Sequence, residues 1–171
     1  LRMEVAVTSD KPTIWNAANH SYWNLDGTEG WAGHRLQIAA AHYLPTDSDF
    51  IPTGQILPVA AGDHDFRAGK VIAPHQPDLD NCYCLGTTPE PLREVLWLTG
   101  ASGVKMAVAT TEAGVQVYDG RHAVRPGHSA FEGVAIETQG WPDAPNKAGF
   151  PSIDLTAGET RVQITEWRFG A

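Results

Sequence analysis

The stretch REVLWLTGASGVKMAVATT, residues 93–111, has the pattern of two β-strands joined by a tight turn. Its two arms, Arg93–Thr99 and Val104–Thr111, are rich in residue types that are common in strands. The four residues between the arms, GASG, contain two glycines, which is typical of a short hairpin connection. The stretch therefore predicts a β-hairpin, and strand-like patterns continue on both sides of it.

Four further segments alternate in the manner of strands: Leu1–Thr8, Gly114–Gly120, Gly133–Gly140 and Thr160–Gly170. The alternation of the last one falters near Glu166, which predicts a β-bulge there. Short strands separated by turn residues favour an all-β fold, a sandwich or a barrel, in one domain over residues 1–171. The segment Leu44–Pro74, rich in proline, glycine and aspartate, is expected to be extended loop with short strands.

The composition argues against several classes of protein. The chain of 171 residues has a formal net charge of −8 and only 12 lysines and arginines, so neither a nucleic-acid surface nor an anionic membrane surface is expected. No apolar run approaches the roughly 20 residues of a membrane span, and Leu1–Thr8 lacks the apolar block of a signal peptide. Cys82 and Cys84 fit neither a redox motif nor a zinc site, and two reduced thiols indicate the cytoplasm.

Glu137 is the first candidate for chemistry. In the strand VAIETQ, Val134 and Ile136 share one face, and Glu137 and Gln139 share the other. If the apolar face packs on the core, partial burial raises the pKa of the Glu137 carboxyl and makes it a base near neutral pH. The alternative is a strand glutamate on a solvated face.

Three more side chains have useful chemistry. His20 can serve as a general acid, or it is a structural histidine bonded to a turn. Asp80 and Gln116 are hydrogen-bonding groups of the kind that hold sugar hydroxyls. Their alternatives are an Asx-turn and a surface strand, respectively. The seven histidines form no HxH or HExxH motif, so no metal is expected.

Five segments in this order resemble the aldose 1-epimerases, also called galactose mutarotases. They are NHSYWNLDG (19–27), YLPTDSDFIPTGQILPV (43–59), LDNCYCL (79–85), GVQVYDG (114–120) and the block 133–169. Trp23 stands where the family usually has phenylalanine, and Asn81 where it usually has histidine. The resemblance covers nearly the whole chain and implies the family's large antiparallel super-sandwich.

The resemblance also implies a role for each candidate. His20 corresponds to the acid that protonates the ring oxygen of a free hexose, galactose or glucose. Glu137 corresponds to the base that takes the proton of the anomeric hydroxyl. Asp80 and Gln116 fall where the family holds sugar hydroxyls, and no cofactor is implied because only protons move.

Family members are longer, and Leu1 aligns inside a strand near their middle. The resemblance therefore implies the second half of the fold. Three readings stay open: a fragment, one half of a split or nicked protein whose first half comes from a second chain as partner, or a short family member. Two interpretations stay open: an aldose 1-epimerase, or a non-catalytic carbohydrate-binding sandwich or inactive mutarotase fragment. A sugar-phosphate epimerase would need clustered basic residues, and the arginines are scattered.

Overall fold

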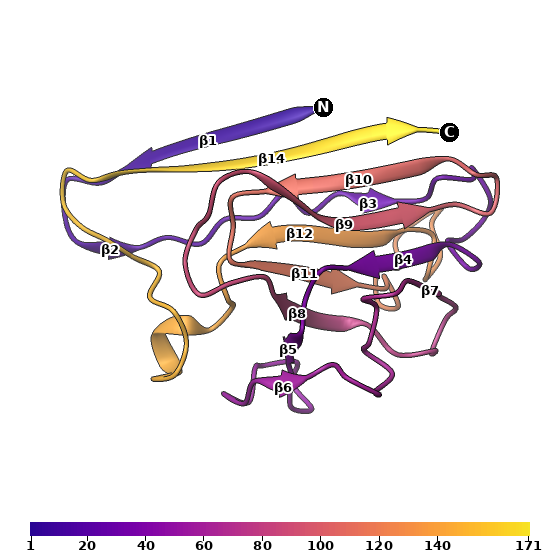
Figure 1. The fold of residues 1–171 in the computed structure, drawn as a ribbon, viewed down its shortest axis with the longest axis horizontal. Helices are drawn as coiled ribbons and strands as arrows, with labels where there is room; N and C mark the ends of the chain where they lie inside the picture. Colours follow the sequence, from indigo (N-terminus) through magenta and orange to yellow (C-terminus); the bar gives the residue numbers. More distant parts are fainter.

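The computed structural model describes residues 1–171, and its regular secondary structure is almost entirely antiparallel β-strand. Two six-stranded sheets lie face to face, and both chain ends lie along the same edge of the molecule (Figure 1). The antiparallel β-sandwich predicted from the sequence is confirmed. No helix in the structure has the length and apolar character needed to cross a bilayer.

The first sheet contains, in spatial order, β1 (Arg2–Thr8), β14 (Thr160–Gly170), β10 (Lys105–Thr110), β9 (Arg93–Thr99), β4 (Arg35–Ile38) and β7 (Lys70–Val71). The second sheet contains β3 (Tyr22–Trp23), β12 (Val134–Gln139), β11 (Gly114–Tyr118), β8 (Asp80–Cys84), β5 (His42–Leu44) and β6 (Leu57–Pro58). A small ribbon pairs β2 (Thr13–Ile14) with β13 (Asp154–Leu155), and the one helix is the short 3₁₀ segment η1 (Ala144–Asn146).

The predicted hairpin is confirmed as β9 and β10. The backbone N–H of Gly100 donates to the carbonyl of Val104 at 2.8 Å and closes the turn. The Asp26 carboxylate braces this turn from outside, because it accepts from the backbone N–H groups of Ala101, at 2.8 Å, and Ser102, at 3.0 Å. The turn is therefore tied to the NLDG segment, almost 80 residues earlier in the chain.

The bulge predicted near Glu166 is wrong. Glu166 pairs with Arg2 on one side and Ala109 on the other without a shift of register. The irregularity lies instead in β9, where the residues opposite Val108 and Ala109 are Leu96 and Glu94, so that Val95 is the extra residue.

The alternation of β14 falters because two polar side chains of that strand face the interior. Gln163 and Thr165 are fully buried, and both bond to Thr138 of β12 in the opposite sheet. The hydroxyls of Thr165 and Thr138 lie 2.6 Å apart, and Gln163 Nε2 donates to the Thr138 carbonyl at 2.8 Å. These bonds satisfy the two hydroxyls and the Gln163 amide nitrogen, and they join the two sheets, while the Gln163 amide oxygen stays buried without a partner.

Nineteen buried apolar residues fill the space between the sheets. A second cluster of seven, which includes Cys82 and Trp141, packs on the outer face of the second sheet under the segment that follows β12. This segment covers one part of that outer face. The neighbouring part, over Glu137 and Asp80, carries polar side chains instead.

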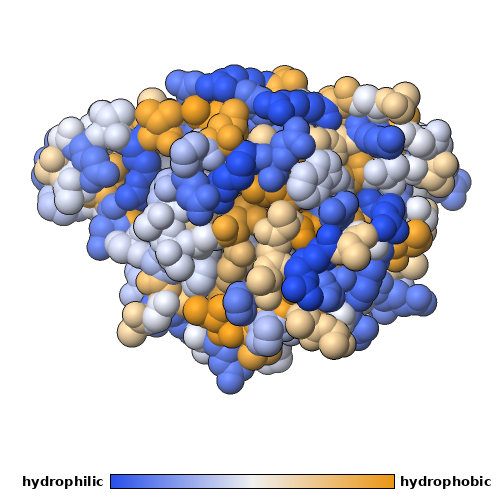
Figure 2. Space-filling view, viewed as in Figure 1, coloured by the Kyte–Doolittle hydropathy of each residue, from blue (hydrophilic) through white to orange (hydrophobic).

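The edge of the first sheet is charged. Arg2 on β1 pairs with Glu4 and with Glu166, and Arg168 pairs with Glu166 as well. In Figure 2 hydrophilic residues gather along this upper edge, where β1 and β14 lie in Figure 1. Charged side chains of this kind discourage pairing of an edge strand with another chain.

Candidate active site

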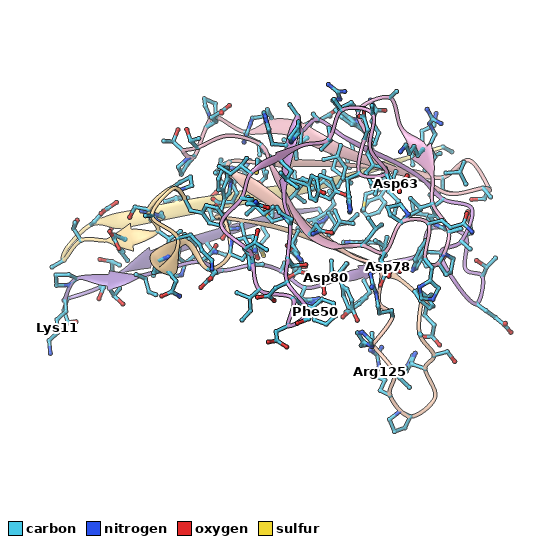
Figure 3. The ribbon with its side chains drawn as sticks, turned by 90° about the horizontal axis from the view of Figure 1, so that it is seen from below. Lys11, Phe50, Asp63, Asp78, Asp80 and Arg125 are labelled. Carbon is cyan, nitrogen blue, oxygen red and sulfur yellow. The ribbon has the colours of Figure 1, made fainter.

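Three polar side chains from neighbouring strands form the floor of the candidate site. Glu137 on β12 lies directly opposite Gln116 on β11, so the two side chains share the outer face of the second sheet. Asp80, at the start of β8, joins them through a hydrogen bond to Gln116. Figure 3 shows Asp80 on this outer side of the sandwich, with the loop that carries Arg125 projecting beyond it.

The Gln116 amide is oriented by Asp80 and leaves one atom without a partner. Gln116 Nε2 donates to Asp80 Oδ1 at 2.8 Å, and a carboxylate can only accept, so the amide oxygen must point the other way. That oxygen, Oε1, is buried and has no hydrogen-bond partner. A buried acceptor without a donor is costly, so the floor suits a ligand that brings a hydroxyl group.

Glu137 is largely buried, with 10% of its side chain exposed. Burial raises the pKa of its carboxyl above the usual value, nearby His20 lowers that pKa, and Asp80 raises it again. Burial likewise raises the pKa of Asp80, against the opposing effect of the Gln116 amide. Glu137 therefore does not lie on a solvated face, and its carboxylate is a stronger base than an exposed glutamate.

His20 lies beside Glu137, with His20 Nε2 3.5 Å from Glu137 Oε1. The imidazole is about half exposed, at 52%, so a ligand can reach it. In such a pair the buried carboxylate can accept a proton from one atom of a ligand, and the accessible imidazole can donate a proton to another.

Asparagines hold His20 in place. The Asn19 side-chain oxygen accepts from the backbone N–H and the hydroxyl of Ser21, which fixes the turn around His20. The Asn16 amide makes two bonds with the backbone of Gly140, donating to its carbonyl at 3.2 Å and accepting from its N–H at 2.8 Å. Gly140 follows β12, so Asn16 ties the loop of the imidazole to the strand of the carboxylate. Neither asparagine is among the site residues predicted from the sequence.

Five rings form an arc around this floor, here called the aromatic arc. The His20 and Tyr22 rings stack with centroids 5.0 Å apart, and Tyr22 meets Tyr118 edge-on at 6.3 Å. The Tyr118 hydroxyl accepts from the backbone N–H of His122 at 2.7 Å. The His122 ring meets the Phe50 ring edge-on at 6.0 Å. Tyr118, His122 and Phe50 were missed from sequence, because no local pattern relates them.

Two glycines allow the arc to close on the floor. A side chain on Gly133 would place its Cβ 2.9 Å from the Cβ of Tyr22, so glycine lets β3 approach β12. Gly120 has a φ of +77°, and a Cβ there would lie 2.7 Å from the Gly133 carbonyl oxygen. The turn after β11 therefore requires glycine.

A buried ion pair shapes the loop of His122. The carboxylate of Asp119 is fully buried, and it accepts from the Arg121 guanidinium at 2.8 Å and from the backbone N–H of Leu79 at 3.1 Å. Arg121 also reaches Asp78 at 3.1 Å. The loop is thus anchored to the two residues that precede Asp80.

The two departures from the family pattern do not enter the site. Trp23 faces the interior, where its ring lies 6.0 Å from that of Trp167. Asn81 is buried and donates to the Leu44 carbonyl at 3.0 Å. Nowhere in the structure do three or more histidine, cysteine, aspartate or glutamate side chains gather as a metal-binding group.

Comparison with known proteins gives one consistent result. The family model described as aldose 1-epimerase matches residues 1–168. Human galactose mutarotase is 36% identical over 178 residues, covering 94% of this chain and 51% of the human protein. The aldose 1-epimerase of Escherichia coli K12 is 31% identical over 182 residues, with 95% and 52% covered.

Solved structures agree. The GalM/aldose epimerase homologue from C. elegans superposes with a TM-score of 0.90 at 28% identity, covering 99% of this chain and 55% of the other. The galactose 1-epimerase of Lactobacillus acidophilus gives 0.83 at 26% identity, with 99% and 52% covered. The chain spans about half the length of the curated relatives it matches.

Proposed function

The chain belongs to the aldose 1-epimerase family, and we propose that it interconverts the α and β anomers of a free hexose, galactose or glucose. One observation carries this proposal: the His20 imidazole and the buried Glu137 carboxylate lie 3.5 Å apart on the face that also carries Gln116 and Asp80. The two oxygens that exchange protons in a hemiacetal are bonded to one carbon, so an acid and a base this close together can serve both.

In the proposed reaction Glu137 removes the proton of the anomeric hydroxyl while His20 donates a proton to the ring oxygen. The bond between C1 and the ring oxygen breaks, and the open aldehyde rotates about C1–C2. The ring closes on the other face as both proton transfers run in reverse, so the two groups end as they began. Burial favours the first step, since it raises the pKa of Glu137 and makes its carboxylate a better base.

Asp80 and Gln116 are proposed to hold sugar hydroxyls. The Asp80 carboxylate can accept from one hydroxyl, and the unpartnered Gln116 Oε1 can accept from another. In this role a sugar hydroxyl supplies the hydrogen-bond donor that Gln116 Oε1 lacks in the free protein. The binding groups therefore favour a neutral polyhydroxylated ligand.

The test is polarimetry of freshly dissolved α-D-galactose and α-D-glucose with and without the purified chain. We expect mutarotation above the buffer rate, in proportion to protein concentration. Glu137→Gln and His20→Asn should each lower kcat by about 10²–10⁴-fold, the usual contribution of a positioned acid or base. Glu94→Gln, on the outer side of the first sheet, is the matched control and should keep the wild-type rate. A wild-type rate in Glu137→Gln would remove Glu137 from the mechanism.

The competing function is sugar binding without catalysis, which predicts saturable binding and no acceleration by a folded sample. In that outcome, adding a second chain that carries the remaining half of the relatives' length tests whether a partner completes the site.

We propose the cytoplasm as the compartment, because Cys82 and Cys84 are both free thiols. Cell fractionation checks that location.

A further inference from the structure

We propose that Phe50 and His122 form an aromatic wall that packs against the C–H face of the bound pyranose ring. This inference rests on the proposed function and adds a binding contact to it. The wall is defined by these two rings, which close one end of the aromatic arc.

Phe50 lies at the tip of the connection between β5 and β6. The Asp47 carboxylate braces this tip, accepting from the backbone N–H groups of Asp49 at 2.9 Å and Ile51 at 3.1 Å. The backbone of Phe50 itself donates to the Asp47 carbonyl at 3.1 Å. The Phe50 ring therefore projects from a turn that is fixed by hydrogen bonds.

The backbone of Phe50 is strained, with a φ of +61°. A bulky side chain in this left-handed region is an outlier that costs on the order of 1–3 kcal/mol, and such outliers cluster at functional sites. Burial does not compensate for the strain, since 48% of Phe50 stays exposed. A strained, exposed aromatic ring in the free protein is explained if a ligand covers it.

The second ring of the wall, His122, is positioned by a residue that borders the floor of the site. His122 donates its backbone N–H to the hydroxyl of Tyr118, and Tyr118 lies directly opposite Asp80 in the sheet. The proximity of His122 also lowers the pKa of Asp80, although burial of that carboxyl has the larger, opposite effect. In Figure 3 Phe50 lies beyond Asp80 on the outer side of the sheet.

The wall therefore stands at the Asp80 end of the floor, whereas His20 and Tyr22 stand at the Glu137 end. A pyranose lying between them places hydroxyls on the floor and C–H groups against the rings. Aromatic side chains are suited to such apolar faces. Because the wall lies away from the reacting pair, its effect falls on binding and not on proton transfer.

The experiment compares Phe50→Ala with Ile51→Ala, a matched control in the same turn with 47% exposure. For galactose, Phe50→Ala should raise KM and the calorimetric Kd by roughly two- to twelvefold, the range expected for loss of an aromatic packing contact, with kcat within twofold. Phe50→Tyr, which keeps the ring, should restore wild-type values. His122→Ala removes the other half of the wall and should match Phe50→Ala.

Galactitol is the ligand control, because it keeps the configuration of galactose at C2 to C5 on an open chain and has no ring face. Its affinity should change less than twofold in Phe50→Ala. Equal loss for galactose and galactitol, or an unchanged galactose affinity in both Phe50→Ala and His122→Ala, overturns the wall even when the wild-type chain accelerates mutarotation. If the folded wild-type chain neither binds galactose nor accelerates its mutarotation, the proposed function itself fails and the wall fails with it.

Discussion

Replacing Gln116 by methionine should separate sugar binding from folding. The change keeps the length of the side chain but removes its amide, including the bond from Nε2 to Asp80 at 2.8 Å and the buried Oε1 that lacks a partner. Both effects can be given magnitudes. A hydrogen bond to a charged group contributes about 1.5–3 kcal/mol, and an unsatisfied buried polar atom costs about 1–3 kcal/mol.

In the free protein these two effects have opposite signs. Losing the bond to Asp80 destabilises the fold, while removing the unpartnered oxygen stabilises it by abolishing the cost of burying that atom. The free energy of unfolding should therefore change by only about 1 kcal/mol. In the sugar complex only a loss remains, because a ligand hydroxyl would have satisfied Gln116 Oε1. A loss of about 1–3 kcal/mol raises the Kd for galactose by roughly 5- to 150-fold.

Denaturant unfolding and isothermal titration calorimetry with galactose measure the two quantities. Gln37→Met is the control, since Gln37 lies on β4 in the other sheet and bonds only to the Arg67 carbonyl. It should leave the Kd unchanged. A Gln116→Met protein with wild-type affinity and a loss of stability above about 3 kcal/mol would show that the amide is structural, and the reasoning would be refuted.

Three further predictions concern ionisation. Burial raises the pKa of Glu137, so its carboxylate should be protonated, and kcat should fall, as pH drops through a value above the ordinary glutamate value of about 4.3; an acid limb of the polarimetric rate at or below that value would contradict the assignment. Because the pKa of Glu137 is higher in the folded state than in the unfolded state, the folded state binds this proton more tightly. The ionised Glu137 carboxylate therefore destabilises the fold at neutral pH. Replacing it in Glu137→Gln should raise the denaturant midpoint of unfolding. Burial also raises the pKa of the Cys84 thiol to about 12, so iodoacetamide at pH 8 should label the native protein slowly and the unfolded protein rapidly. Equal rates in the two states, followed by mass spectrometry, would show that the thiol is accessible and ionised.

The sequence predicted most of the fold because the alternation of residues along each strand separates its buried face from its other face. Arg93–Thr99 matches β9 residue for residue, and the alternation in Val134–Gln139 correctly separated the Val134 side from the Glu137 side. The failure at Glu166 has a clear cause. The prediction from periodicity assumed an apolar interior, but β14 turns Gln163 and Thr165 inward, where both bond to Thr138 on β12.

The candidate site was predictable only in part. His20, Glu137, Asp80 and Gln116 belong to motifs, and the structure brings all four to one face. Their roles remain predictions for the assays above. The rest of the aromatic arc lies on segments far apart in the chain, and only the folded arrangement relates a ring at residue 50 to one at residue 122.

The hydroxyl pair of Thr138 and Thr165 has a consequence for the precision of the site. Apolar contacts have no preferred direction, so a wholly apolar interior would allow the two layers to slide slightly past each other. A hydroxyl pair at 2.6 Å tolerates little displacement. Thr138 is the next residue after Glu137, so the bond serves as a positional reference that fixes β12 along its own axis. Stability and accuracy can then be in conflict: valines in place of both threonines would make the interior more apolar while removing the fixed position of β12 relative to the first sheet.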